Sequence, residues 1–464
     1  MLTVESFWRD FLNLPLPHKQ TPDTNYLLAY SGGCDSHVLL HLFASLKQTG
    51  VVKNVKAIHV NHQLHTNSDS WASHCFEQCK QYNIACDVVK VNIDKKHNKG
   101  LEAAARTARY AVFEQLVTKD TYLLTAQHAD DQLETFLLQS LRGSGVKGLS
   151  SMPIYRQFGK GFLCRPLLSV NQQSIVSYAK KNALDWIDDP SNLNTDYDRN
   201  FLRHKITPVL KQRWPSVEQT FSRVTQYQAE AAELNDELAK IDLSALQTVQ
   251  EDQELISIEA LKNLSVSRQK NVLRFWISQV RKLTMPDHKH LMRILNEIIV
   301  ASTDAQPRVA WHDTVVRRFQ GNLYAQKDDS YTVLAPIESW MPEQVYSLKG
   351  IDGANVSQGE SLVTHAEKGK GLSIEKVKDK KVSIRFRQGG EVCCPQGRGQ
   401  HHHKLKNLFQ EWQVEPWMRD KIPLVFVDEV LAQVVGYCVC EPFVAQANEP
   451  SYNIVVSNSS SNKG

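Results

Sequence analysis

Short apolar runs alternate with helical patterns from about residue 25 to residue 150 of the chain. The runs are NYLLAY, VKAIHVN, CDVVKVNI and TYLLTAQ, and the segments between them carry apolar residues at helical spacing. Strands that alternate with helices in this way build a doubly wound parallel sheet of the α/β class. The ligand crevice of such a sheet lies at the carboxyl ends of its strands, so this segment predicts a nucleotide-binding domain.

The remaining sequence predicts two further domains, because 464 residues are too many for one compact core. Helical patterns at 217–240, 264–280 and 287–301 predict a helical middle domain. A segment rich in glycine, serine and charge at 345–372 predicts a linker or an exposed loop. Beyond it, VSIRFR, KLKNLFQEWQ and PLVFVDEVLAQVVGYCV predict a small α+β domain. The predicted domains are 1–215 (catalytic, α/β), 216–345 (helical) and 370–456 (α+β).

The composition, 42% apolar and 22% charged, is that of an ordinary globular protein rather than a disordered or fibrous one. No stretch has the length and apolarity of a membrane span, and the first residues lack the pattern of a signal peptide. Nine cysteines without framework spacing indicate reduced thiols. We therefore expect a cytoplasmic protein with no membrane partner. A net charge of +4 permits a polyanionic partner without requiring one.

The chain passes from the first predicted strand into the first predicted helix through the string SGGCDS. Gly32 and Gly33 allow successive backbone N–H groups to point into one concavity. The positive end of the helix and the hydroxyls of Ser31 and Ser36 would strengthen this anion site. The site has no lysine of the Walker type, and Asp35 would repel an anion unless a cation lay between them, which indicates Mg²⁺. The simpler alternative is a tight turn in which Asp35 only caps the helix.

The string SGGCDS after an apolar strand resembles the signature of the PP-loop ATPases, the N-type ATP pyrophosphatases. In that family the loop binds the pyrophosphate end of ATP, and the enzyme adenylates a substrate oxygen and releases pyrophosphate. The resemblance implies that ATP is bound by the whole loop, which comprises Ser31, Gly32, Gly33, Cys34, Asp35 and Ser36. It implies no catalytic role for the Cys34 thiol.

Further motifs narrow the resemblance within the PP-loop ATPases. In chain order they are EAAARTARY, TAQHADDQLET, LRGSGVKGLSSM, RPLL, DDPSN and RNFLRHKITPVL. Together with SGGCDS they resemble the tRNA(Ile)-lysidine synthetases over about 25–215, and the resemblance resumes at IRFRQGGE and KLKNLFQEWQVEPWMRDKIPLVF. This chain departs from the usual pair of histidines by carrying Gln127 and His128 there, although Gln127 can still make a hydrogen bond.

The resemblance implies an ATP-dependent ligase that forms a carbon–nitrogen bond on tRNA. Such enzymes adenylate the C2 oxygen of the wobble cytidine in the CAU anticodon of an isoleucine tRNA. The ε-amine of free L-lysine then displaces AMP to give lysidine, so that the tRNA reads AUA codons as isoleucine. The implied cofactors are ATP and Mg²⁺ and the implied partners are this tRNA and lysine; the oligomeric state is left open, a homodimer included.

The motifs also supply the candidate catalytic residues. Mg²⁺ held near Asp35 and Asp131, together with Arg106 and Arg109, would neutralise charge while the α-phosphorus is attacked. Each has a simpler explanation: the arginines lie three apart on one face of a predicted helix, where they could be solvated, and Asp131 lies in a first helical turn, where acids favour the helix dipole.

The attacking lysine must be neutral, so a carboxylate is needed to hold its ammonium and accept a proton. Asp130, Asp131 and Glu134 are equal candidates from the sequence alone. The candidate substrate contacts are His128, Asp130, Glu134, Arg199 and Arg203. The glycine-rich string LRGSGVKGLSSM predicts either a mobile lid or tRNA contact, or only a surface loop.

Two basic stretches predict contacts to the tRNA backbone. One crosses from the catalytic domain into the middle domain, and the other lies in the third domain; the resemblance implies that both of these later domains bind tRNA. Residues 199–224 carry six Lys or Arg against one acid, and residues 376–406 carry nine against two. Solvated surface is the alternative explanation for both. The histidines at 401–403 and Cys393 with Cys394 raise a zinc hypothesis, but no C-x₂-C pair has the spacing of a structural site.

Three other functions compete with lysidine formation. A tRNA thiolase needs a cysteine pair or an iron–sulfur cluster, for which Cys75 and Cys79 are weak candidates. An amidotransferase synthetase such as GMP synthetase needs a glutaminase domain, and none is evident. A noncatalytic tRNA-binding protein is disfavoured because Asp35, Ser36 and Asp131 are all present.

Overall fold

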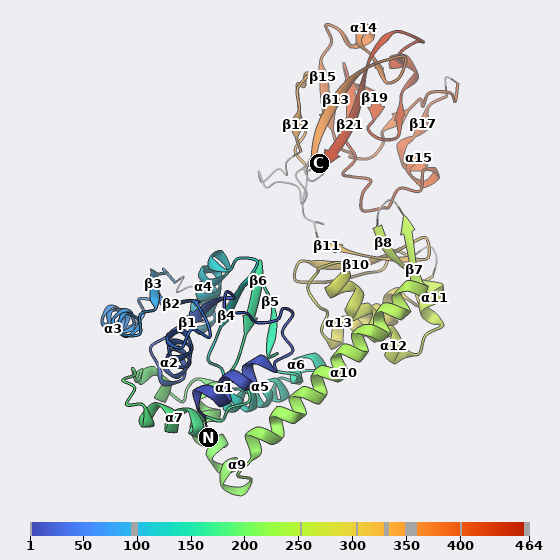
Figure 1. The fold of residues 1–464 in the computed structure, drawn as a ribbon. Helices are drawn as coiled ribbons and strands as arrows, with labels where there is room; N and C mark the ends of the chain where they lie inside the picture. The colour runs from blue at the N-terminus through green and yellow to red at the C-terminus, as the bar shows by residue number, and fades with distance from the viewer. Residues whose placement is uncertain are drawn as a thin grey trace. The chain divides into compact units, whose positions relative to one another are not determined.

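The computed structural model describes residues 2–93, 101–250, 253–302, 305–328, 334–348, 360–399 and 401–458. The chain divides into two compact units, Met1–Glu237 and Leu238–Gly464, which are described separately (Figure 1). None of the helices in these ranges is long and apolar enough to cross a membrane.

The N-terminal unit is built on a six-stranded sheet with strand order β3-β2-β1-β4-β6-β5. Every neighbouring pair is parallel except β5 with β6, so the predicted doubly wound sheet is confirmed. The strand order reverses between β1 and β4, which places the ligand crevice at the carboxyl ends of these two strands. The strands are β1 (Asn25–Ala29), β2 (Asn54–Asn61), β3 (Ala85–Lys90), β4 (Thr121–Leu124), β5 (Tyr155–Phe158) and β6 (Gly161–Cys164).

Helices cover both faces of this sheet, and β1 shows why its sequence is a continuous apolar run. Tyr26 and Leu28 belong to the core on one face, whereas Leu27 packs into a second core on the other face with Phe113. The helices are α1 (Val4–Leu12), α2 (Cys34–Gln48), α3 (Ser68–Gln81), α4 (Leu101–Leu116), α5 (Ala129–Leu141), α6 (Val146–Leu149), α7 (Gln172–Lys181), η1 (Pro190–Leu193), α8 (Asp198–Phe201), η2 (Leu202–Ile206) and α9 (Thr207–Arg213).

The middle segment contains the predicted helices and also a sheet that the sequence did not predict. The helices are α10 (Val217–Leu246), α11 (Ile258–Lys262), α12 (Val266–Phe275), η3 (Trp276–Val280), α13 (His288–Arg293) and η4 (Ile294–Ile298). The sheet has the order β7-β8-β11-β10-β9, with β7 (Gln247–Gln250), β8 (Gln253–Ser257), β9 (Arg308–Trp311), β10 (Thr314–Phe319) and β11 (Asn322–Lys327). Strand β10 is buried at five successive positions, Arg317 and Arg318 included, so no two-residue alternation marks it.

The last segment confirms the predicted strand VSIRFR, the helix KLKNLFQEWQ and the strand pair after it, which are β15, α15, β18 and β19. Its two larger sheets have the orders β12-β13-β21-β14 and β15-β18-β19-β20, and β16 pairs with β17. The bounds are β12 (Tyr346–Ser347), β13 (Glu360–Lys368), β14 (Leu372–Ser373), α14 (Ile374–Val377), β15 (Val382–Arg385), β16 (Val392–Cys393), β17 (His403–Lys404), α15 (Leu405–Glu411), β18 (Leu424–Val427), β19 (Val430–Val434), β20 (Cys438–Val439), η5 (Glu441–Phe443) and β21 (Pro450–Asn458).

The linker predicted at 345–372 is wrong over its second half. Residues 349–359 lie outside the described part of the chain, but Glu360–Lys368 is a strand paired with β21 along its whole length. Ladder hydrogen bonds to a strand some 90 residues later stabilise this segment, and no local pattern reveals them. The three predicted domain boundaries stay a prediction.

Candidate active site

The corner between β1 and α2 strongly favours glycine at position 32. Gly32 has a φ of +89°, which side chains rarely adopt. A Cβ there would lie 2.6 Å from Ile187 Cδ1 and 2.8 Å from Cys75 Sγ. The Gly32 carbonyl also accepts a hydrogen bond of 2.9 Å from the Ile187 N–H. Contacts from two distant segments therefore fix the turn.

The two serines of the corner hold the loop in shape. Ser36 Oγ donates to the Gly33 carbonyl at 3.0 Å and accepts from the Ser31 N–H at 3.2 Å. The Ser31 and Ser36 hydroxyls are 3.0 Å apart. Gly33 is the N-cap of α2 and offers no side chain to the helix N–H groups, so the positive end of α2 is open to an anion.

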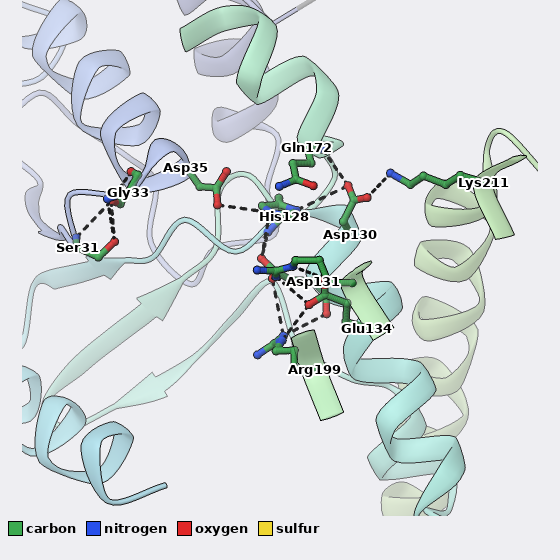
Figure 2. A network of polar contacts seen from close by, with 12 residues as sticks. Ser31, Gly33, Asp35, His128, Asp130, Asp131, Glu134, Gln172, Arg199 and Lys211 are labelled. Carbon is green, nitrogen blue, oxygen red and sulfur yellow. Dashed lines mark hydrogen bonds and ion pairs between the residues drawn. The ribbon is translucent and has the colours of Figure 1, made fainter. Parts of the chain in front are cut away.

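The corner between β4 and α5 brings His128 and Asp131 to the same place. The His128 N–H donates to Asp131 Oδ2 at 3.1 Å, so Asp131 caps the start of α5. The His128 side chain is only 1% exposed, and its Nε2 lies 3.6 Å from Asp35 Oδ2 and 3.5 Å from Asp131 Oδ2 (Figure 2). The two predicted Mg²⁺ ligands, Asp35 and Asp131, therefore both lie next to the His128 imidazole.

The charge state of His128 follows from its neighbours. Burial by itself lowers the pKa of this imidazole, but Asp131, Asp35 and Asp130 outweigh burial and raise the pKa to about 9. Burial by itself raises the pKa of the Asp131 carboxyl. The positive charges of His128, Arg199 and Arg203 outweigh burial and hold this pKa below its ordinary value. The centre of the site therefore holds an imidazolium between carboxylates at neutral pH.

Two arginines from the segment around η2 neutralise carboxylates of α5. Arg203 Nε and Nη2 donate to the Glu134 carboxylate at 2.7 and 2.9 Å, and Nη2 also lies 2.9 Å from Asp131 Oδ1. Arg199 Nε donates to Glu134 Oε2 at 3.0 Å. The Glu134 side chain is 1% exposed and accepts three hydrogen bonds from these guanidinium groups, one at Oε1 and two at Oε2. Two guanidinium groups therefore already hold this buried carboxylate.

Asp130 has a different set of partners. Its Oδ2 accepts from the Gln172 N–H at 2.8 Å, at the start of α7, and its Oδ1 contacts Lys211 Nζ (Figure 2). Lys211 belongs to the basic stretch 199–224, for which the sequence predicts contacts to the tRNA backbone. Its contact with Asp130 spans 81 residues, so no local signal could have revealed it.

Comparison with known proteins supplies the family. Residues 6–210 match the model of the PP-loop domain, 256–324 that of the TilS substrate binding domain, and 382–456 that of the TilS substrate C-terminal domain. The chain is 42% identical to the tRNA(Ile)-lysidine synthase of Coxiella burnetii over 437 residues, 94% of either chain. It is 38% identical to that of Methylococcus capsulatus over 420 residues, 89% of this chain and 92% of the relative.

The chain belongs to the tRNA(Ile)-lysidine synthase family. The PP-loop match covers both corners of the site, and the PP-loop ATPase fold and use of ATP follow from it. Membership confirms the resemblance carried by the motifs and does not favour the thiolase or noncatalytic alternatives.

In this member of the lysidine synthase family, Arg106 and Arg109 lie on α4 and contact Tyr110. Arg106 Nη2 donates to the Tyr110 hydroxyl at 3.3 Å, and both guanidinium groups lie over its ring. Burial first, then Arg109, lower the pKa of His62, which follows β2, to about 4. Arg109 therefore lies near the carboxyl end of β2. Among the described residues no ion pair joins Arg106 to Asp35 or Asp131, and the catalytic role of the two arginines stays a prediction.

Three thiols of the N-terminal unit, those of Cys34, Cys75 and Cys79, are unreactive in this arrangement because their pKa values are raised. Burial first, then Asp35 and Asp188, raise the pKa of Cys34 to about 12. Cys75 and Cys79 are fully buried, and burial first, then Cys86, raises the pKa of Cys75 to about 12. Cys75 instead packs against Gly32. The geometry therefore gives the C-x₃-C pair a structural role.

The two basic stretches differ from simple tRNA-facing surfaces. In the first, Arg199, Arg203 and Lys211 contact the α5 carboxylates. In the second, the arginines form exposed ion pairs, Arg385 with Glu429, Arg387 with Asp420 and Arg398 with Glu411. No group of three or more metal-ligating side chains occurs within the ranges that the structure describes, the histidines at 401–403 included. The string LRGSGVKGLSSM forms the single-turn helix α6 and flanking turns.

Proposed function

We propose that this chain forms lysidine on tRNA(Ile) by adenylating the wobble cytidine and joining it to free lysine. The observation that carries the proposal is the meeting of two corners at the point where the strand order reverses. One corner presents an uncapped helix N-terminus to an anion, and the other brings Asp131 and His128 to Asp35. A phosphate site beside carboxylates suits nucleotidyl transfer to a substrate oxygen.

The chemistry explains why ATP is needed. The C2 oxygen of cytosine is a poor leaving group, and an adenylate at this oxygen is a good one. A cytidine of the anticodon loop is single-stranded, so its base edge can be turned into a pocket. Gly32, Gly33 and the first turn of α2 would then hold the phosphates of ATP through backbone N–H groups.

Asp35 fits an Mg²⁺ ligand better than Asp131 does. Mg²⁺ sites of nucleotide enzymes use one or two carboxylates, with water and phosphate oxygens completing the shell. The Asp35 side chain is 36% exposed and its ion-pair partner is His128, whereas both oxygens of Asp131 already contact Arg203 or the His128 N–H. When bound, Mg²⁺ would neutralise charge on the phosphates. Asp35 would hold it, with Asp131 as a weaker second ligand.

The test is an assay of purified protein with ATP, Mg²⁺, radiolabelled lysine and a CAU-anticodon isoleucine tRNA transcript. We expect lysine in the tRNA and one pyrophosphate released for each lysine incorporated. A methionine tRNA transcript, which carries the same anticodon, is the matched control and should remain unlabelled. Pyrophosphate release without lysine incorporation would instead point to another PP-loop reaction, and the absence of both would refute the proposal.

A further inference from the structure

The three carboxylates of α5 are neutralised by two kinds of cation. Glu134 and Asp131 are held by guanidinium groups, and the bonds from Arg203 to Glu134 are two-point contacts of 2.7 and 2.9 Å. Asp130 is held by the ammonium of Lys211. A guanidinium locks a carboxylate in a planar fork, whereas an ammonium is a point charge on a flexible four-carbon chain. Asp130 is thus the carboxylate whose partner another alkylammonium could replace.

The burial of the pair is uneven. The Asp130 side chain is 4% exposed and the Lys211 side chain 31% exposed. Asp130 is also fixed from the other side by the Gln172 N–H at 2.8 Å. The carboxylate therefore stays in place, while the lysine reaches it from solvent and can return to solvent.

A second observation shows unused polar capacity beside Asp130. His128 is 1% exposed, and neither of its ring nitrogens has a hydrogen-bond partner in the described part of the chain. Its Nδ1 points toward Asp130 Oδ2 at 3.8 Å, too long for a hydrogen bond. Buried polar atoms without partners are uncommon and call for a ligand or water. Both nitrogens of the imidazolium are donors, so the group that would satisfy Nδ1 beside Asp130 is a hydrogen-bond acceptor, such as water or the α-carboxylate of free lysine.

We propose that Lys211 is an internal stand-in for the substrate: free lysine places its ε-ammonium on Asp130 and displaces the Lys211 ammonium into solvent. The inference rests on the proposed function and selects Asp130 among the three carboxylates that the sequence left equal. The exchange replaces one butylammonium with another, so the charge of the site does not change. Asp130 is never left buried and unpaired, which would be strongly unfavourable.

The stand-in has a measurable consequence for lysine affinity. A tethered group competes at an effective concentration in the millimolar range, and free lysine binds only the fraction of molecules in which Asp130 is open. Removing the Lys211 ammonium should lower the KM for lysine by about tenfold. Replacing it with a guanidinium, which can bind Asp130 by two points, should raise that KM.

The experiment measures the KM for lysine in the tRNA assay for Lys211→Met and Lys211→Arg. A purely structural ion pair predicts the reverse order: Lys211→Arg would resemble the unaltered protein, and Lys211→Met would melt earlier with an unchanged or raised KM. Lys180→Met, which removes an exposed lysine of α7, is the matched control and should leave the KM unchanged. If Lys211→Met does not fold, Lys211→Arg decides alone, because the two views differ there too.

The outcomes also separate this inference from the proposed function. If the unaltered chain incorporates lysine and both variants have the same KM for lysine as the unaltered chain, Lys211 is not a stand-in for the substrate. Lysidine formation would remain supported in that case. An unaltered chain that incorporates no lysine would overturn both.

Discussion

The two corners at the carboxyl edge of the sheet are built by opposite means. The β1–α2 corner is a short glycine loop whose side-chain hydrogen bonds are made by its own serines over at most five residues of chain, and one backbone bond, from the Ile187 N–H to the Gly32 carbonyl, comes from farther away. The β4–α5 corner depends on cations that arrive from 65 to 81 residues away. One corner leaves backbone N–H groups open for an anion, and the other is already filled with matched charge.

The difference shows how the two corners can share one site. An open corner can take a ligand without first breaking anything, which suits a phosphate chain. A filled corner fixes its carboxylates in position and admits a ligand only by exchange of cations, as inferred for Lys211. His128 connects the corners, because its Nε2 contacts Asp35 while its Nδ1 faces Asp130.

The largest effect should come from Asp35→Asn, which removes the charge of the open corner. We expect tRNA-dependent pyrophosphate release to fall by at least about 100-fold, because the Mg²⁺ that would neutralise the phosphates loses its charged ligand. Affinity for tRNA, measured by filter binding, should not change. Near-normal turnover in the variant would remove Asp35 from the metal role.

Glu134→Gln tests whether the filled corner depends on matched charge. The change leaves Arg199 and Arg203 with one buried carboxylate fewer, and the free energy of unfolding should fall by about 2–3 kcal/mol. Urea unfolding of the full chain measures this loss. A double-mutant cycle with Arg203→Met should show strong coupling, and additive losses would mean that this ion pair does not hold the corner together.

Gly32→Ala tests the shape of the open corner. The new Cβ would meet Ile187 and Cys75 at 2.6 and 2.8 Å, in addition to the strain of a φ of +89°. We expect unfolding free energy to fall by about 1–3 kcal/mol and the KM for ATP to rise. Gly50→Ala is the matched control, since Gly50 has a φ of +76° but nothing within 4 Å of its Cβ position. Equal losses in both variants would show that the clash contributes nothing.

The last effect appears only as a pH dependence and concerns His128, the histidine that connects the corners. Its pKa is raised to about 9 in the folded chain, against about 6.5 when unfolded, so its contribution to stability is complete below pH 6.5 and is lost as the pH rises through 9. In EDTA, the unaltered chain should lose roughly 2 kcal/mol more than His128→Gln between pH 6.5 and 9. Parallel pH profiles of unfolding free energy would contradict this.

The sequence predicted most of what depends on neighbours along the chain. The sheet of the N-terminal unit follows from apolar runs such as NYLLAY, and the open corner follows from SGGCDS, because periodicity and glycine conformation act over a few residues. The sequence did not predict β10, because burial at successive positions removes the two-residue alternation of apolar and polar residues. It did not predict β13 either, because this strand is stabilised by pairing with β21, which is distant along the chain. The same limit applies to Arg106 and Arg109, because their motif can be recognised in the sequence but the side chains that they meet depend on the tertiary structure.

By itself, then, the sequence determined the fold class, the family and the chemistry available at each corner. Only the tertiary structure decided which charges meet. The sequence does not distinguish Asp130, Asp131 and Glu134, since all three are acidic residues in the first turns of one helix. They become different because Arg199, Arg203 and Lys211 reach them from another segment, and electrostatic interaction depends on distance in space rather than along the chain.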